Sequence, residues 1–192
     1  MHTLDDFQHQ LEKAIGRSAT SRPFVCEGSP LDCGVFIVGF NPATDMSADF
    51  WKFWTPGYGF DKAAWFDAYK AESLNKPLRP GKTRRTAVSP TRRVIEWICE
   101  AASPVRCLES NIYSTATPDM NSLGHEDRDA AIFRFLVETI KPSVIVAHGK
   151  DAGREADRFS GRAKILAVPH FSRGLSEKKA RELGAEIRLL AA

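Results

Sequence analysis

One apolar segment constrains the fold of this chain more than any other. Residues 35–40, VFIVGF, hold five apolar side chains interrupted only by Gly39. A strand that is apolar on both faces is typical of a parallel sheet with helices on each side. Asn41 and Pro42 follow at once, and Pro42 cannot donate a backbone hydrogen bond or continue the strand. We therefore expect a sharp turn that leaves the Asn41 carboxamide at the carboxyl edge of the sheet, where open α/β sheets bind ligands.

The rest of the chain alternates between predicted helices and strands. Further strands are predicted over 105–114, 143–149 and 163–172, and helices over 3–16, 49–54, 62–74, 90–102, 127–140, 151–159 and 177–190. Single crossovers of this kind produce a parallel sheet with helices on both faces. With 192 residues and 43% hydrophobic content, the chain predicts one domain over 1–192: a three-layer α/β/α fold with a central four-stranded parallel sheet.

The positive charge is concentrated in one segment. Residues 76–93 contain seven basic side chains and no acidic one, whereas the whole chain carries +3, so the remainder carries −4. Ser89 and Pro90 have the pattern of an N-cap and first helical residue, and helix N-termini attract phosphates. The segment therefore suits a polyanion such as a nucleic-acid backbone, although a solvated basic loop has the same composition.

The remaining composition excludes several classes of protein. No run approaches the roughly 18 apolar residues of a membrane span, so we expect a cytoplasmic protein that does not enter a membrane. Four cysteines lack a C-x-x-C pair, which favours reduced thiols over disulfides and makes an iron–sulfur cluster the weaker alternative. The sequence also lacks the phosphate-binding glycine loops, the nucleophile elbow and the H-E-x-x-H zinc motif. We expect no metal and no cofactor.

A polar side chain stands near the end of each predicted strand. These residues are Asn41, Asn111, His148 and His170. Because parallel strands end at the same edge, we expect the four side chains to meet there and to form hydrogen bonds with a small polar ring. Each also has a simpler interpretation, as a carboxamide that caps a loop or an imidazole that binds backbone groups.

Five motifs in this order resemble the uracil-DNA glycosylase superfamily. They are GFNPA (39–43), FWK (50–52), Asn111, HGK (148–150) and HFSRGLS (170–176). The pattern is most similar to the mismatch-specific and single-strand-selective branches, which share a Gly-x-Asn-Pro first motif. The resemblance implies a monofunctional DNA glycosylase that removes uracil or a related deaminated base by hydrolysis of the N-glycosidic bond, as in base-excision repair.

The resemblance also implies roles for individual residues. Asn41 and His170 are the expected catalytic residues, because an amide can orient a water without being ionised and an imidazole can donate to the base that leaves as an anion. Asn111 offers a donor and an acceptor that match uracil. The expected base-binding residues are completed by Gly39, Ala43, Phe50 and Phe53, with an aromatic ring stacking on the flipped base.

The DNA itself is expected to contact a second set of residues. These are Ser89, Arg92, Arg93, Lys150, Ser172 and Arg173. The expected partner is DNA with a flipped or single-stranded damaged base, bound by a monomer. Two alternatives remain open at this point: a non-catalytic glycosylase-like protein that binds nucleic acid through its basic segment, and a hydrolase of small nucleosides or nucleotides.

Overall fold

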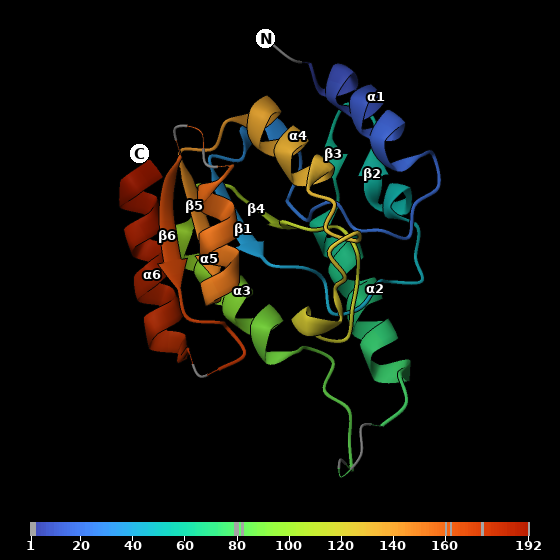
Figure 1. Cartoon of the computed structure of the whole chain (residues 1–192), viewed down its shortest axis with the longest axis vertical. Helices are drawn as coiled ribbons and strands as arrows, with labels where there is room; N and C mark the ends of the chain where they lie inside the picture. Colours follow the sequence, from blue (N-terminus) through green and yellow to red (C-terminus); the bar gives the residue numbers. More distant parts are fainter. Residues whose placement is uncertain are drawn as a thin grey trace.

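The computed structural model describes residues 3–78, 81, 83–159, 161, 163–173 and 175–191. Its centre is a sheet of four parallel strands in the order β4–β1–β5–β6, seen in Figure 1. The strands are β1 (Val35–Gly39), β4 (Cys107–Asn111), β5 (Val144–His148) and β6 (Lys164–Val168). The expected four-stranded parallel sheet is therefore confirmed, with β1 and β5 at its centre.

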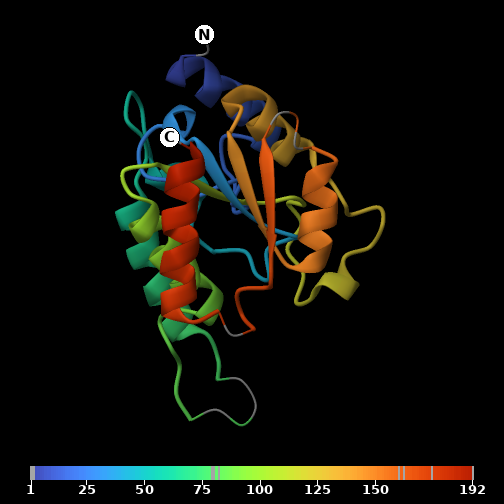
Figure 2. The same cartoon turned by 90° about the vertical axis from the view of Figure 1, so that its left-hand side faces the viewer.

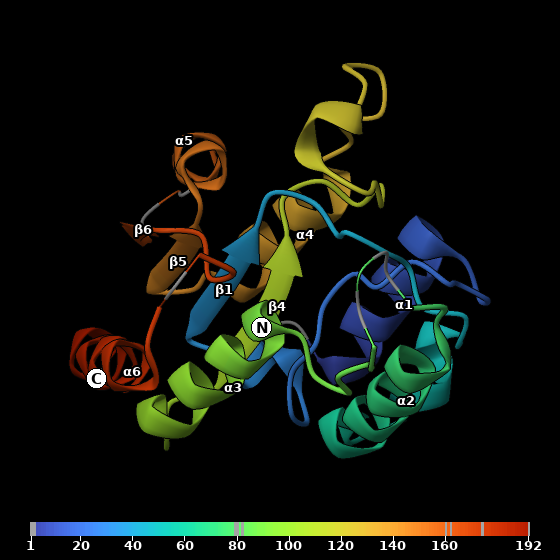
Figure 3. The same cartoon turned by 90° about the horizontal axis from the view of Figure 1, so that it is seen from below.

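Alternate residues of β1 face opposite sides of the sheet. Val35 and Ile37 pack with the helices α3 (Pro90–Ala102) and α6 (Glu177–Ala191). Phe36 and Val38 belong to the core on the other side, together with side chains of α1 (Leu4–Ile15), α4 (Ala131–Ile140) and α5 (Lys150–Asp157). Figures 2 and 3 show the two helical layers separated by the sheet. Burial on both faces explains why β1 lacks polar side chains.

Local signals set the ends of several helices as the sequence predicts. Thr3 and Asp6 form a capping box at the start of α1. The Ser89 hydroxyl accepts the Arg92 backbone N–H at 3.2 Å and caps α3, and the Ser176 hydroxyl accepts the Lys179 N–H before α6. Capping oxygens satisfy N–H groups that have no partner within the helix. The helix α2 (Lys62–Asn75) is capped in the same way by Asp61.

The predicted helix over 49–54 is wrong. Phe50–Phe53 form a single 3₁₀ turn, and the chain then enters a small antiparallel hairpin of β2 (Trp54–Thr55) and β3 (Gly59–Phe60). Phe60 exchanges backbone hydrogen bonds of 2.8 and 2.9 Å with Gly28. The Pro56-Gly57 turn therefore joins two strands rather than two helices, because a distant segment supplies the backbone partner.

The predicted helix over 127–140 begins four residues later, at Ala131. The Asp127 carbonyl accepts the Thr115 hydroxyl at 3.0 Å, and the Asp129 carboxylate accepts the Ala131 N–H at 2.8 Å. Residues 127–130 thus hold the preceding loop instead of forming a helical turn. Two further 3₁₀ turns are Pro30–Asp32 and Met120–Ser122. Across the described residues, no helix has the length and apolar character that crossing a membrane requires.

The close contact between α3 and α6 gives a test of the fold. The two helices lie side by side, and a Cβ atom at Gly184 would lie 2.5 Å from the Ile98 carbonyl oxygen and 2.7 Å from Ala101 Cβ. Gly184→Ala should therefore lower the free energy of unfolding by about 1–3 kcal/mol in urea denaturation, the usual cost of overpacking. Leu189→Ala, at a 78% exposed position on the same helix, is the control. Equal stabilities for the two variants would contradict this packing.

Candidate functional site

Three neighbouring strands place a row of residues at the carboxyl edge of the sheet. In the ladder between β1 and β4, Gly39 pairs with Asn111. On the other side of β1, the register places His148 one position beyond the pair of Val38 and Ala147. All three residues therefore lie on the face covered by α3 and α6, with Gly39 in the middle.

Because Gly39 has no side chain, the side chains of Asn111 and His148 approach its Cα from the two neighbouring strands. A Cβ atom at position 39 would lie 2.6 Å from Asn111 Oδ1 and 3.1 Å from His148 Nε2. Real Cβ atoms essentially never come within 3.0 Å of another heavy atom, so the Asn111 carboxamide can keep this position only beside a glycine. The expected role of Gly39 in a base-binding site is compatible with this geometry, because the missing side chain lets two polar groups approach each other.

His148 is a buried, neutral imidazole. Its ring stacks on Phe171 with centroids 4.4 Å apart and meets the His170 ring edge-on at 4.9 Å. Burial, with smaller contributions from His170 and Arg92, lowers the pKa of His148 to about 3. Its Nδ1 atom is buried and has no hydrogen-bond partner among the described residues. A buried polar atom without a partner is costly, so its retention needs an explanation.

His170 is held in one tautomer by the residue two positions further on. The Ser172 backbone N–H donates to His170 Nδ1 at 3.2 Å, and the Ser172 hydroxyl lies 2.7 Å from the same nitrogen. Burial and the nearby Arg173 lower the pKa of His170 below its ordinary value. A neutral imidazole that accepts at Nδ1 carries its proton on Nε2. His170 therefore has an N–H donor available for a ligand.

The Asn41 carboxamide is oriented by a neighbouring loop. Its Nδ2 group donates to the Thr117 hydroxyl at 2.7 Å and to the Thr115 carbonyl at 3.1 Å. The Thr117 backbone N–H in turn donates to the Pro42 carbonyl at 3.0 Å. Because the amide nitrogen is occupied, Oδ1 is the atom left to accept a hydrogen bond from a ligand or a water. The expected turn at Asn41 and Pro42 is present.

Other predicted residues surround this edge at the surface. Ala43 is exposed in the turn after Pro42, and Lys150 is the exposed first residue of α5. Ser172 and Arg173 are also exposed, next to His170. Gly174, part of the last motif, lies outside the described residues.

Phe50 and Phe53 belong to the aromatic core. Their exposures are 3% and 8%, and the Phe50 ring lies 5.2 Å from Phe60 and 5.3 Å from Phe24. Their side chains are thus occupied by packing within the protein, which does not fit the expected stacking on a flipped base. The large hydrophobic area of these rings, buried beside the β2–β3 hairpin, explains the difference.

Arg92 does not fit the expected contact with DNA. Its side chain is buried, forms an ion pair with Glu109 on β4, and bonds Glu96 at 2.9 Å. Lys62 also pairs with Glu109, at 2.9 Å, and the Arg92 guanidinium lies over the Trp65 ring at 4.8 Å. These two cations hold the pKa of Glu109 below its ordinary value despite burial. Arg92 is an internal cation that connects α3 to the sheet.

The remaining basic residues lie on a projecting segment. Figures 1 and 2 show the described part of the connection between α2 and α3 extending beyond the body of the molecule, at the end where β6 leads into α6. Arg84 and Arg93 are exposed, and Arg85 donates from Nε to the Lys76 carbonyl at 2.8 Å. Ser89 is half-buried, and its hydroxyl caps α3. Two further basic residues, Arg79 and Lys82, lie outside the described residues.

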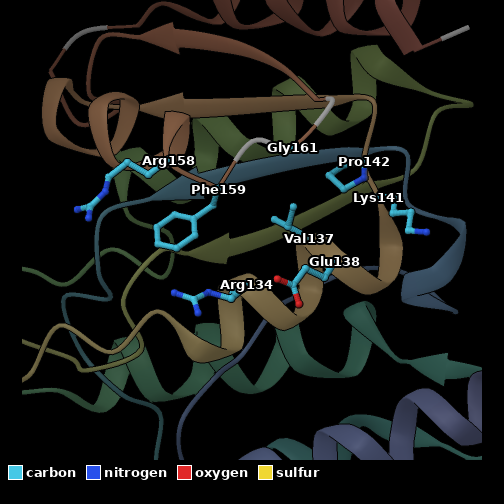
Figure 4. Close-up of a pocket in the computed structure, with 8 residues that line it drawn as sticks. All are labelled: Arg134, Val137, Glu138, Lys141, Pro142, Arg158, Phe159 and Gly161. Carbon is cyan, nitrogen blue, oxygen red and sulfur yellow. The ribbon is translucent and has the colours of Figure 1, made fainter.

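A cavity of about 840 Å³ lies at the opposite edge of the sheet. Figure 4 shows the Phe159 ring between Arg134 and Arg158, with Lys141 and Pro142 just before β5. The Arg134 guanidinium lies 5.6 Å from the centre of the Phe159 ring. The residues that line this cavity precede β5 and β6, whereas the predicted site residues follow the strands. The cavity is therefore separate from the row at Gly39.

Comparison with known proteins does not assign this site. No family model matches the chain, and no curated protein matches it. No group of three or more His, Cys, Asp or Glu side chains in the described part of the chain is arranged to hold a metal ion. The four cysteines are free, with Cys26 and Cys33 buried.

Sequence reasoning missed two residues at this edge, Thr115 and Thr117. It predicted His148 there, as one of four polar residues at the strand ends, but assigned it no catalytic, base-binding or DNA-binding role. Its position on the same face as Asn111 follows only from the strand register. Thr115 and Thr117 carried no signal, because the loop that brings them to Asn41 is held by Asp127 and by the Pro42 carbonyl.

The buried imidazole predicts a pH dependence of stability. The pKa of His148 is about 3 in the folded chain and ordinarily 6.5, so between these values the unfolded chain binds a proton that the folded chain does not. This stabilisation is therefore present above pH 6.5 and is lost as the pH falls toward 3. In His148→Phe, the unfolding free energy should fall less steeply, by up to about 1.4 kcal/mol per pH unit. Urea unfolding between about pH 4 and 7 measures both slopes, and equal slopes would contradict a neutral buried His148.

Proposed function

We propose that this protein is a monofunctional DNA glycosylase that removes uracil or a related deaminated base by hydrolysis. The proposal rests on the resemblance of its five motifs to the uracil-DNA glycosylase superfamily. The observation that carries it is the orientation of two side chains: Asn41 has Oδ1 available as an acceptor, and His170 has Nε2–H available as a donor. Both belong to the carboxyl edge of the sheet, the usual ligand site of open α/β folds.

The acceptor and the donor have complementary tasks in this reaction. Cleavage needs a water positioned at the sugar carbon, and an amide oxygen can accept a hydrogen bond from this water without carrying charge itself. The base leaves as an anion, and the His170 N–H can stabilise negative charge on its carbonyl oxygen. A donor placed where charge develops contributes roughly 3–4 kcal/mol in other enzymes. The lowered pKa of His170 keeps the imidazole neutral near pH 7.

The row at Gly39 is the proposed recognition site for the base. Asn111 Oδ1, which no side chain at Gly39 covers, can accept the ring N–H of uracil. An enzyme that acts on a base in duplex DNA must first rotate the base out of the stack. The exposed Ser172 and Arg173, beside His170, are proposed to contact the distorted strand. Lys150 and Arg93 are proposed to contact phosphates.

Loss of either catalytic side chain should reduce excision far more than binding. Asn41→Ala and His170→Ala should each lower the single-turnover excision rate about 100- to 1,000-fold, with DNA affinity nearly unchanged, because both groups act mainly in the transition state. The assay uses oligonucleotides with one uracil, hypoxanthine or mismatched thymine, followed by hot alkali. Exposed residues of the same types provide controls: Asn75→Ala and His9→Ala should retain activity.

The outcome of this assay also decides between enzyme and binding protein. The basic segment can bind nucleic acid without any catalytic group, so it supports the alternative of a non-catalytic glycosylase-like protein. Excision by the wild-type protein that is lost in both variants supports the enzyme. Binding without excision of any base would replace the enzyme by the binding protein.

The projecting basic segment should determine the salt dependence of DNA binding. Neutralising Arg84, Arg85 and Arg93 to Gln should weaken binding to all sequences equally. It should reduce the slope of log affinity against log salt by roughly 0.7–0.9 for each lost phosphate contact. Arg134, Lys141 and Lys164 changed to Gln remove the same charge at the opposite edge and provide the control. An identical slope in both triple variants would show that the segment is only a solvated loop.

A further inference from the structure

The cavity at the amino-terminal edge of the sheet has the size of a small-molecule site. Its volume of about 840 Å³ falls within the range of roughly 300–1,000 Å³ that is typical of pockets for small ligands. Its walls come from α4, from the turn between α4 and β5, and from the segment after α5. The cavity has no part in the proposed glycosylase reaction, because it lies at the opposite edge from Asn41 and His170.

One end of the cavity offers a surface for a flat ring. Figure 4 shows the Phe159 ring between the side chains of Arg134 and Arg158. The Arg134 guanidinium lies 5.6 Å from the centre of this ring, and the Phe133 ring meets it nearly at right angles, with centroids 5.8 Å apart. Phe159 is only half-buried. Nucleic-acid bases stack on aromatic rings and on arginine guanidinium planes, so this end suits a base.

The other end of the cavity carries a cation in an unusual backbone conformation. Lys141 ends α4 with a φ of 56°, in the left-handed region that favours glycine at a helix C-terminus. Its backbone N–H donates to the Val137 carbonyl at 2.9 Å, and its side chain is exposed. A lysine here carries backbone strain that a glycine would avoid. The retained side chain therefore indicates a task for its charge, and a lysine ammonium is a common ligand of phosphate groups.

Three of the four charged side chains around the cavity are not neutralised by a neighbour. Arg158 pairs with Glu155 at 3.0 Å, whereas Arg134 and Lys141 form no salt bridge with any residue that the structure describes. Glu138 lies between these two cations on α4 and, within the same described residues, also forms no salt bridge. The seven positions from Arg134 to Lys141 correspond to about 10 Å along a helix. A ligand of this length can reach the ring surface, the carboxylate and Lys141 together.

We propose that this cavity binds a ribonucleoside monophosphate, a small anion with a planar base, a ribose and one phosphate group. The base stacks against Phe159 and Arg134. The Glu138 carboxylate accepts hydrogen bonds from the ribose hydroxyls, and Lys141 neutralises the phosphate. These are the tasks that acidic side chains and lysines perform in other nucleotide sites. The cavity shares no residue with the proposed glycosylase site, so the two proposals are independent.

Calorimetric titration of the full chain with AMP and with adenosine tests this assignment. Adenosine lacks only the phosphate of AMP. The wild type should bind AMP about tenfold more tightly than adenosine, the typical worth of one hydrogen bond between charged groups. Lys141→Gln should remove this difference by weakening AMP binding alone. Lys164→Gln removes an exposed lysine at the same edge, outside the cavity lining, and should leave both affinities unchanged.

Two further variants separate the base from the phosphate and binding from folding. Phe159→Leu keeps an apolar side chain but loses the stacking surface, so it should weaken AMP and adenosine equally, by about tenfold. Lys141→Gly should bind AMP as weakly as Lys141→Gln. Its melting temperature should equal or exceed that of the wild type, because glycine adopts the left-handed conformation without strain. Loss of binding in this variant is therefore not a loss of the fold.

Several results would overturn the inference. They are no binding of AMP by the wild type, equal affinities for AMP and adenosine, and an AMP affinity that is the same in Lys141→Gln and Lys164→Gln. Inorganic phosphate bound as tightly as AMP would show an anion site without a base. Asn41→Ala should bind AMP as the wild type does, and a loss of AMP binding in this variant would place the nucleotide at the carboxyl edge instead. A failure of uracil excision leaves the titration unaffected.

Discussion

The absence of a side chain at Gly39 is the constraint on which the candidate site depends. In a parallel sheet, residues of neighbouring strands at the same register stand side by side on one face, and here two polar residues flank one glycine. A Cβ atom at position 39 would lie 2.6 Å from Asn111 Oδ1 and 3.1 Å from His148 Nε2, so a larger residue would displace the Asn111 carboxamide. Asn41 and His170 lie just beyond the ends of the strands, so their positions depend on the loops. Asn111 and His148 are thus placed by the sheet, whereas the proposed catalytic groups are placed by loops that the sheet anchors.

A buried cluster of ion pairs around Glu109 fixes the elements next to this site. Glu109 is two residues before Asn111 on β4, and it pairs with Lys62 of α2 and Arg92 of α3. A buried carboxylate that loses a partner costs several kcal/mol, whereas the intact cluster fixes the relative positions of its elements. The two helices that carry the basic segment between them are therefore tied to the strand that carries Asn111. This connection places the positive segment at the same end of the molecule as the site.

Much of the sheet was predictable because long apolar runs with polar ends are local signals. β1 and β5, and the caps of α1, α3 and α6, depend on residues adjacent in the sequence. The hairpin of β2 and β3 depends on Gly28, about thirty residues away, and a local pattern of four aromatic residues could not reveal it. Arg92 was expected to contact DNA for a similar reason. A basic residue in the first turn of a helix has the pattern of a surface cation, and only Glu109 on β4 explains its burial. Asn41, Asn111 and His170 were placed at the correct edge because every parallel strand ends there, but the loop carrying Thr117 gave no sign of where it would dock.

The two outer strands of the sheet differ in how far their outward-facing backbone groups are paired. Beside β4, Val25 exchanges two backbone hydrogen bonds of 2.8 Å with Glu109, which pairs the middle residue of that edge. β6 is the last strand of the sheet in the described part of the chain, so one row of its backbone groups lacks a neighbouring strand. Exposed strand edges invite pairing with a second chain, and proteins limit this hazard with short strands and charged residues. β6 has five residues and begins with the exposed Lys164. The strand that leads to His170 therefore has two of the features that limit pairing between strand edges, a short length and a charged residue.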